Sequence, residues 1–454
     1  MTIKKLFNLL MIFSVFSGAF VLGSVGFEFY LSYVIFFFFI LVYLLHTKSI
    51  CVSKGFSLIL FYFIISSLLC VIIFRLPYYL LFKQIIGITF SAVAYYLMIK
   101  MNNYDIEKLF KLYLKFAIII STLGVFQEVS FLLNFRLGYD WAFFLPKSGN
   151  PGTSLFFLRV SSIMPEPSML AIILTPAAFV VLANLFSKRK IYLSRLAGLV
   201  ILAAYLLTFS AIGYLGLIFC SLLILYQKGY LNIKKQKVLI LPVIIMILFF
   251  VFYLAYSSLP GIKSRVDAFR ALASQPDQLL NLSVVMDRNA SVLILYSNID
   301  AAFNSIRKSP LFGSGLGTHA ENFDKYYGRL IDEANISGKL RILRGWGFGI
   351  SKADANSLFV RLLSETGIVG VLIVLWLLMR YFIKRIDLSS AADSDAAIYN
   401  LSIINNGIFL LIVMRLVRFG HYFVDGFFFF VFIYYFSNMQ VKARLLAIKE
   451  RPAQ

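Results

Sequence analysis

Ionisable side chains interrupt a long apolar segment near the C-terminus. Asp354, Arg361 and Glu365 follow one another at spacings of seven and four residues, which places them on one face of a helix. Glu365 would lie roughly 13 Å along that helix from Asn356, at a rise of about 1.5 Å per residue. Charges at such depth in a membrane are costly and by default face a polar cavity. Arg361 and Glu365 therefore mark either an interior route or a structural clasp, and Asp354 is either a chemical base or the helix cap.

Two arginines lie three residues apart at the end of a second apolar segment. Arg415 and Arg418 precede His421 across Gly420, and Asp425 follows four residues later. Two cations that close repel each other in a low-dielectric setting unless an anion joins them. A pyrophosphate carried by a lipid would be such an anion, and we expect the pair to bind one.

Two further arginines belong to long connections between apolar segments. Arg159 precedes the run MPEPS at 164–168, in which the prolines fix the backbone around Glu166. In the alternative interpretation, Ser168 caps the following helix and Glu166 complements its dipole. Arg288 continues the apolar stripe of a predicted helix and would point toward the membrane domain. The alternative for Arg288 is a side chain that snorkels to water.

The composition places these residues in a membrane protein. Of the 454 residues, 60% are hydrophobic and 14% are charged, which is far from the average of soluble proteins. Runs of about 18 or more apolar residues predict about twelve spanning helices, at 6–24, 29–46, 56–74, 78–99, 112–133, 168–186, 193–209, 211–226, 238–257, 357–382, 398–417 and 420–438. Basic residues fall in alternate connections, so the positive-inside rule predicts that both termini are cytoplasmic.

The long connections are all on the predicted outer side, where we therefore expect the chemistry. Residues 1–257 hold the first nine spans with the outer loop 134–167, residues 258–356 form the large outer loop, and residues 357–454 hold the last three spans. Apolar residues at helical spacing predict two amphipathic helices in the large loop, the second running from near Asp287 until Pro310 stops it. No strand of any length is indicated.

Several reaction classes lack sequence support. The chain carries no HExxH motif, Walker loop, GxSxG motif or zinc-type cluster of Cys and His, so neither a metal site, a cofactor nor a nucleotide-driven mechanism is expected. The formal net charge is +22, but the basic residues lie at membrane edges, where anionic lipid accounts for them. We therefore expect membrane lipid as a partner and no nucleic acid.

Short motifs give the chain a family resemblance. The run RNASVLILYSNIDAAFNSIRKSPLFGSGLG at 288–317, the sequence ANSL at 355–358 and the sequence LSETGIVG at 363–370 resemble the O-antigen ligase and polymerase superfamily of bacterial envelope glycosyltransferases. Arg159 ahead of Glu166, and the layout of about twelve spans with one dominant outer loop, resemble it too.

The resemblance implies an all-α polytopic membrane protein of the GT-C type in the bacterial inner membrane, with a large helical periplasmic loop. Its active site would be periplasmic and independent of metal, with an undecaprenyl-pyrophosphate-linked oligosaccharide as donor. Arg159 and Arg288 match the family's pyrophosphate-binding arginines, and Arg415 and Arg418 are further candidates. Such chemistry also needs a base for the acceptor hydroxyl. The candidate bases are Asp354, Glu166 and His319, and the candidate supporting residues are Asn356, Arg361, Glu365 and His421.

One departure from the family pattern bears on the reaction. Ligases usually carry His directly before the Asn of the Asn356 motif, where this chain has Ala355. The sequence therefore favours a polymerase of O-antigen or capsule repeat units over a ligase that transfers finished glycan to lipid A core. A flippase or other transporter is the alternative from a different class, but it has little use for an outer loop of about 100 residues. A chain-length regulator and a flippase are further candidate partners of a polymerase.

Overall fold

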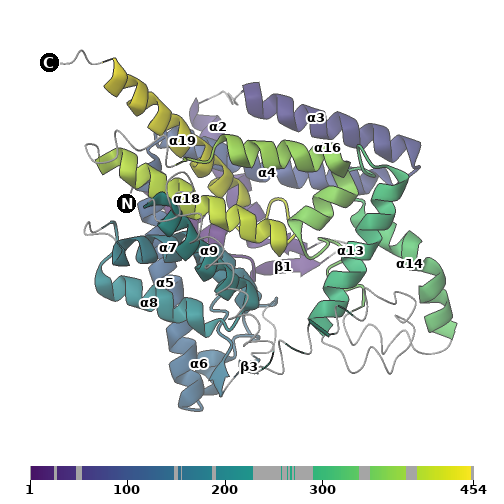
Figure 1. The fold of residues 1–454 in the computed structure, drawn as a ribbon, viewed down its shortest axis with the longest axis horizontal. Coiled ribbons are helices and arrows are strands. Elements are labelled where there is room, and N and C mark those ends of the chain that lie inside the picture. The colour runs from purple at the N-terminus through teal and green to yellow at the C-terminus, as the bar shows by residue number, and fades with distance from the viewer. Residues whose placement is uncertain are drawn as a thin grey trace, which may run out of the picture.

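A computed structural model describes residues 2–24, 28–47, 54–147, 152–154, 156–186, 191–228, 290–336, 348–384 and 396–450, with the single positions 257, 263, 266, 267 and 270. The described residues are mostly helical (Figure 1). The helices are α1 Ile3–Phe13, η1 Ser14–Phe16, α2 Leu31–Thr47, α3 Lys54–Ile73, α4 Tyr78–Met101, α5 Ile106–Leu132, α6 Arg136–Tyr139, α7 Pro167–Leu185, α8 Arg195–Leu207, α9 Ala211–Gln227, α13 Ala290–Lys308, α14 His319–Ile336, α16 Leu358–Arg380, α18 Ala396–Val417 and α19 Phe427–Lys449.

The apolar helices are those of a membrane protein. Five of the described helices, α4, α5, α7, α16 and α18, are long and apolar enough to cross a bilayer. Four shorter apolar helices lie at Leu31–Thr47, Ser57–Ile73, Arg195–Leu207 and Ala211–Gln227. The predicted span 238–257 lies outside the described residues apart from position 257. The membrane class is thus supported, and the count of twelve spans stays a prediction.

Local signals explain where several of these helices begin. The Asp105 carboxylate accepts a hydrogen bond from the Lys108 N–H (3.0 Å) at the start of α5. The Ser194 hydroxyl accepts one from the Ala197 N–H (3.2 Å) at the start of α8. Pro167 lies in the first turn of α7, where a missing N–H costs nothing. These residues satisfy or avoid the unpaired N–H groups of a helix start.

Short strands replace part of the first predicted span. The helix α1 ends at Phe13, and β1 (Val21–Ser24) then pairs antiparallel with β2 (Glu28–Tyr30). A second pair joins β3 (Thr153–Ser154) to β4 (Phe157–Leu158). The prediction of no strands was wrong, because strands of two to four residues are too short to show an alternating pattern.

The last predicted span also begins later than expected. The helix α19 starts at Phe427 rather than near 420, and the residues before it form a loop, 418–426. Phe419 (φ 91°), Asp425 (φ 53°) and Gly426 (φ 63°) adopt left-handed backbone conformations there, which interrupt a right-handed helix. His421 is therefore a loop residue.

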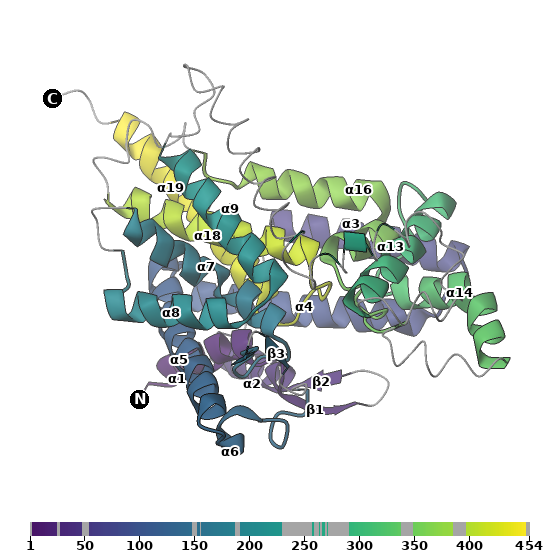
Figure 2. The same ribbon diagram turned by 60° about the horizontal axis from the view of Figure 1, so that its bottom comes forward.

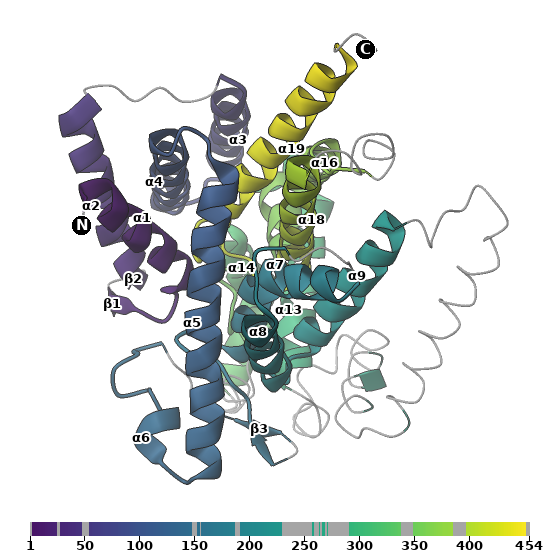
Figure 3. The same cartoon turned by 90° about the vertical axis from the view of Figure 1, so that its left-hand side faces the viewer.

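Most of the described helices pack around a large buried apolar core. The helix α18 packs against α7, α19 and α16, and α7 packs against α9. Figure 2 shows α16 running beside α3, and α3 in turn packs against α4. Figure 3 shows α5 along its full length, with α1 on one side and α8 on the other.

Basic residues gather at one end of this bundle. At one end the N-terminus meets the end of α19, where Lys4 Nζ donates to the Met101 carbonyl (2.6 Å) and Gln440 Nε2 donates to the Tyr104 carbonyl (2.6 Å). A cavity of about 1060 Å³ opens there among Lys4, Lys5, Lys108, Lys111, Lys115 and Arg444. At the other end lie the start of α16, the end of α18 and the loop 418–426. The positive-inside rule predicts that this basic end is cytoplasmic, and the orientation stays a prediction.

Candidate functional site

The turn that leads into α16 presents Asp354. Ala355 and Asn356 both adopt φ of 58°, a left-handed conformation that costs energy for residues other than glycine. The Asp354 Oδ1 accepts a hydrogen bond from the Asn356 N–H (3.2 Å), whereas the helix cap is Ser357, whose hydroxyl accepts from the Val360 N–H (3.3 Å). Asp354 therefore shapes the turn and is not the cap of α16.

The loop 418–426 is fastened directly onto this turn. The Phe419 N–H donates to the Asn356 carbonyl (3.0 Å), and the Ser357 hydroxyl donates to the Leu416 carbonyl (2.7 Å). A Cβ on Gly420 would overlap the Asp354 carbonyl oxygen and lie 2.7 Å from its carbonyl carbon. Only glycine allows the two backbones to approach this closely.

This close approach brings His421 to Asp354. His421 Nε2 lies 3.3 Å from Asp354 Oδ2, and the His421 side chain is 21% exposed. Burial raises the pKa of Asp354, although the Asn356 N–H and the nearby Arg361 oppose the rise. Burial, followed by the cations Arg361 and Lys147, lowers the pKa of His421 well below its ordinary value. His421 is thus a neutral imidazole at neutral pH, and a neutral imidazole can accept a proton.

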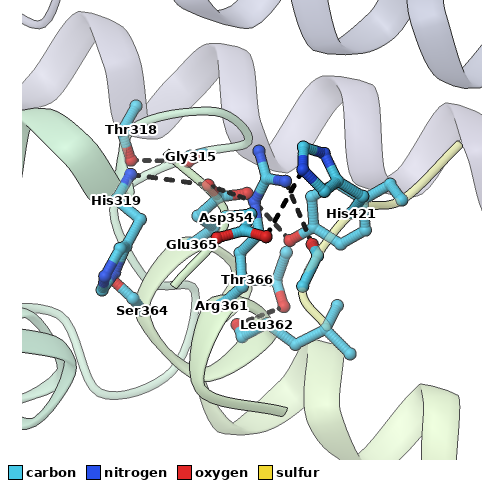
Figure 4. A network of polar contacts seen from close by, with 12 residues as sticks. Gly315, Thr318, His319, Asp354, Arg361, Leu362, Ser364, Glu365, Thr366 and His421 are labelled. Carbon is cyan, nitrogen blue, oxygen red and sulfur yellow. Dashed lines mark hydrogen bonds and ion pairs between the residues drawn. The ribbon is translucent and has the colours of Figure 1, made fainter. Parts of the chain in front are cut away.

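Behind this pair lies a fully buried ionic cluster (Figure 4). Arg361 Nε donates to Glu365 Oε1 (3.0 Å), and Arg361 Nη1 donates to the Gly420 carbonyl (3.0 Å). The Tyr422 hydroxyl donates to Glu365 Oε2 (2.8 Å), and the Arg361 guanidinium lies 4.3 Å from the centre of the Tyr422 ring. Of the two interpretations of the charged face of α16, the geometry matches the structural clasp.

A kink in α16 completes the cluster. Gly367 adopts φ of 65° inside the helix, and a Cβ there would lie 2.6 Å from the Gly313 nitrogen. The Gly315 N–H donates to the Glu365 carbonyl (2.8 Å), and the Ile368 N–H donates to the Pro310 carbonyl (2.9 Å). The glycine-rich turn after α13 therefore packs into the kink.

His319 lies on the inner side of the same cluster. Its backbone N–H donates to Glu365 Oε1 (3.4 Å), and its Nε2 lies 3.1 Å from Asn298 Oδ1. Its side chain has no exposed surface, and burial lowers its pKa to about 3. This candidate base is therefore enclosed by protein.

Two ion pairs flank His421 and Asp354. Arg418 Nη2 lies 3.7 Å from Glu166 Oε2, and these side chains are 29% and 52% exposed. Lys147 pairs with Glu28, and Lys147 Nζ also donates to the Tyr30 hydroxyl (2.7 Å). Lys147 was not among the predicted site residues. The sequence held one indirect indication of it. Glu28 is an isolated acid in an apolar region, with no basic residue close to it in the sequence, so a partner from elsewhere in the chain was to be expected.

Arg415 has a different environment from Arg418. Arg415 is fully buried, and its Nη2 donates to the carbonyls of Val424 (3.0 Å) and Asp425 (3.0 Å). Its guanidinium lies 4.8 Å from the centre of the Phe419 ring. The two arginines therefore contact separate partners, and Arg415 holds the loop 418–426 in shape.

Of the two arginines predicted in the outer loops, Arg159 is described by the structure and Arg288 is not. The Arg159 N–H donates to the Gly152 carbonyl (2.8 Å) beside the β3–β4 hairpin. The same segment is fixed to α5, because Glu128 Oε2 accepts from the Leu158 N–H (3.0 Å) and Gln127 Oε1 accepts from the Ser162 N–H (2.7 Å). Arg288 lies outside the described residues, so its predicted role stays a prediction.

An apolar pocket of about 310 Å³ adjoins the site. Its lining includes Tyr422 of the ionic cluster, together with Leu358 and Leu362, which lie before and after Arg361 in α16. It continues between α16 and α19 to Tyr381 and Phe436. Among the described residues, no group of three or more His, Cys, Asp or Glu side chains could hold a metal ion.

A comparison with known families finds a match that covers part of the chain. Residues 196–375 match a family model, Wzy_C, described as O-antigen ligase. The matched segment includes Asp354, Arg361 and Glu365, whereas His421 follows it. No curated protein matches the chain. The match supports the O-antigen ligase and polymerase superfamily and a membrane glycan-processing function of that kind, and it does not separate ligase from polymerase.

Proposed function

We propose that the protein polymerises lipid-linked oligosaccharide repeat units on the periplasmic face of the bacterial inner membrane. It transfers the growing glycan from polyisoprenyl pyrophosphate to a hydroxyl of a newly arrived lipid-linked unit. The observation that carries the proposal is a single site that joins three elements. A His–Asp pair, with two cations near it, lies close in the chain to Leu358, Leu362 and Tyr422, which line an apolar pocket.

Each element matches one need of the reaction. The pocket between α16 and α19 offers apolar surface for a polyisoprenyl chain. Arg418 and Lys147, both partly exposed, offer positive charge for the pyrophosphate that leaves. Arg159 and Arg288 are proposed as further pyrophosphate ligands from the outer loops. Asp354 and His421, which lie 3.3 Å apart, are proposed as the groups that take the proton of the acceptor hydroxyl.

A polymerase is favoured over a ligase because of Ala355. This residue stands where ligases usually carry His, and it has no exposed surface, so no base projects from that position. A ligase remains the second candidate, since the matching family model carries that description.

Deletion of the gene, followed by gel analysis of surface glycan, tests the proposal. Loss of a polymerase leaves lipopolysaccharide with single repeat units, and the ladder returns when the wild-type gene is supplied. Loss of a ligase leaves no glycan attached while lipid-linked polymer accumulates. Loss of a flippase leaves neither, and either of these last two patterns would refute a polymerase.

A further inference from the structure

The structure leaves the family's usual base position without a base, yet it places an imidazole beside it. His421 comes from the loop after α18, outside the segment that matches the family model. It reaches the turn before α16 because Gly420 allows backbone contact with Asp354. We propose that His421 is the general base that deprotonates the acceptor hydroxyl, and that Asp354 is the positioning residue that orients its imidazole. This proposal rests on the proposed function.

The backbone on both sides of His421 is anchored. Arg361 Nη1 donates to the carbonyl of Gly420 (3.0 Å), the residue before it. The Tyr422 hydroxyl, on the residue after it, donates to Glu365 Oε2 (2.8 Å). The ring of Phe419 lies 5.3 Å from the His421 ring, measured between centres. The buried ionic cluster therefore holds the imidazole in place, as a catalytic group requires.

Asp354 fixes the tautomer that the reaction needs. Its Oδ1 accepts from the Asn356 N–H, and its Oδ2 faces His421 Nε2 at 3.3 Å. A carboxylate at that distance favours the tautomer that carries its proton on Nε2, which leaves the lone pair on Nδ1. In the described part of the chain, the ion pair of His421 is made through Nε2, and Nδ1 is the other ring nitrogen. This nitrogen is therefore the atom that takes the proton.

The other candidate bases are less suited in this geometry. His319 has no exposed surface. Glu166 is paired with Arg418 and accepts a hydrogen bond from the Ser168 hydroxyl (2.9 Å). Asp354 is 8% exposed, and both of its oxygens face protein groups. His421 combines partial exposure with a ring nitrogen outside its ion pair with Asp354.

The step balances without any further reactant. The acceptor oxygen attacks the anomeric carbon of the donor sugar, so a glycosidic C–O bond forms. The bond from that carbon to the pyrophosphate oxygen breaks, and its electron pair leaves with the polyisoprenyl pyrophosphate. The hydroxyl proton passes to His421 Nδ1 and is then released to the departing pyrophosphate or to water.

Donor binding would strengthen this base. The charged groups that face His421 come from several elements: Asp354 before α16, Arg361 in α16, Arg415 in α18, Lys147 in the outer loop and Glu28 in β2. After burial, the cations Arg361 and Lys147 contribute most to the low pKa of His421. An anionic pyrophosphate beside them would offset their charge and raise the pKa of His421 in the complex.

The pH profile follows with a definite sign. A base is active above its pKa, so activity is lost as the pH falls through the pKa of His421. The ratio kcat/KM reports the free enzyme, and kcat reports the complex with substrate. We expect the acidic limb of kcat at a higher pH than the acidic limb of kcat/KM. Both limbs should disappear in His421→Gln.

The decisive experiment uses the full chain in nanodiscs with undecaprenyl-pyrophosphate-linked repeat units. His421→Ala should slow chain extension by about 10²–10⁴-fold, and added imidazole should restore part of the rate. Melting temperature and binding of undecaprenyl pyrophosphate should stay at the wild-type level. His46→Ala is the matched control, because His46 is exposed at the end of α2, and it should be silent.

Further outcomes distinguish a failure of the base assignment from a failure of the proposed function. Asp354→Asn should lower kcat by less than His421→Ala does and should shift the acidic limb of the pH profile. Asp354→Glu, which keeps a carboxylate, should retain part of the rate that Asp354→Asn loses. The assignment of His421 as the base would be overturned if His421→Ala extended chains at the wild-type rate. It would also be overturned if Asp354→Asn lost all activity and imidazole failed to rescue His421→Ala. Either result would leave the proposed polymerase function standing. A wild-type protein that joins no repeat units would overturn the proposed function itself.

Discussion

Replacement of Gly420 by alanine should move the loop 418–426, which carries His421, away from the turn that carries Asp354. A Cβ at this position would overlap the Asp354 carbonyl oxygen, and it would lie 2.7 Å from the Asp354 carbonyl carbon and 3.1 Å from the Ser357 carbonyl oxygen. All three neighbours are backbone atoms, so no side chain can rotate away. The loop 418–426 must therefore move from the turn by about 1 Å or more.

The displacement sets the size of the effect. It weakens the hydrogen bond from the Phe419 N–H to the Asn356 carbonyl and the bond from Arg361 Nη1 to the Gly420 carbonyl. Neutral hydrogen bonds contribute about 0.5–1.5 kcal/mol and charged ones about 1.5–3 kcal/mol, so we expect a loss of stability of up to about 2–4.5 kcal/mol. A misplacement of about 1 Å at reacting groups costs about 100-fold in rate. Chain extension should fall by at least that factor.

The assay compares Gly420→Ala with Gly328→Ala in the same preparation. Gly328 lies in α14, and a Cβ there meets nothing within 4 Å. This control should extend chains like the wild type and melt at the same or a slightly higher temperature, because Ala is the better helix former. Gly420→Ala should melt at a lower temperature and extend chains slowly at a temperature where it is still folded. If Gly420→Ala matches the control in both measurements, the close contact between the loop and Asp354 does not exist in the working protein.

Three other predictions test the cluster, the arginines and the threading. Glu365→Ala leaves Arg361 buried without its carboxylate and should cost about 3–5 kcal/mol, measured as lost thermal stability. The double variant Arg361→Met with Glu365→Leu should recover much of the lost stability. A double variant no more stable than Glu365→Ala would show that the unpaired Arg361 charge is not the cause of the loss. Arg159→Ala or Arg288→Ala should abolish chain extension without unfolding the protein. Lysine at either position should restore the rate only partly, because lysine lacks the planar fork that holds two phosphate oxygens. Normal ladders from either Ala variant would exclude that arginine. Cysteines placed near 150 and 330 should react with an impermeant reagent from outside and those near 190, 232 and 390 should not. Labelling at 232 would contradict the predicted topology.

Local patterns were enough to indicate the class of protein and the ionic cluster. Composition and apolar runs indicated a helical membrane protein, and helical spacing predicted that α13 would stop before Pro310, as it does at Lys308. The spacing of four residues placed Arg361 beside Glu365, and the two do form a buried ion pair. Such features depend only on the period of a helix, which is set by the backbone.

Tertiary packing decided the rest of the site. Residues 420–426 were predicted to begin the last spanning helix, but the left-handed residues Phe419, Asp425 and Gly426 make 418–426 a loop. That loop brings His421 to Asp354, far away along the chain, and encloses Arg415. His319, expected as a base, proved fully buried. Sequence periodicity reports which residues share a helix face, whereas contacts between separate segments arise only when whole helices pack, and so only the folded structure shows them.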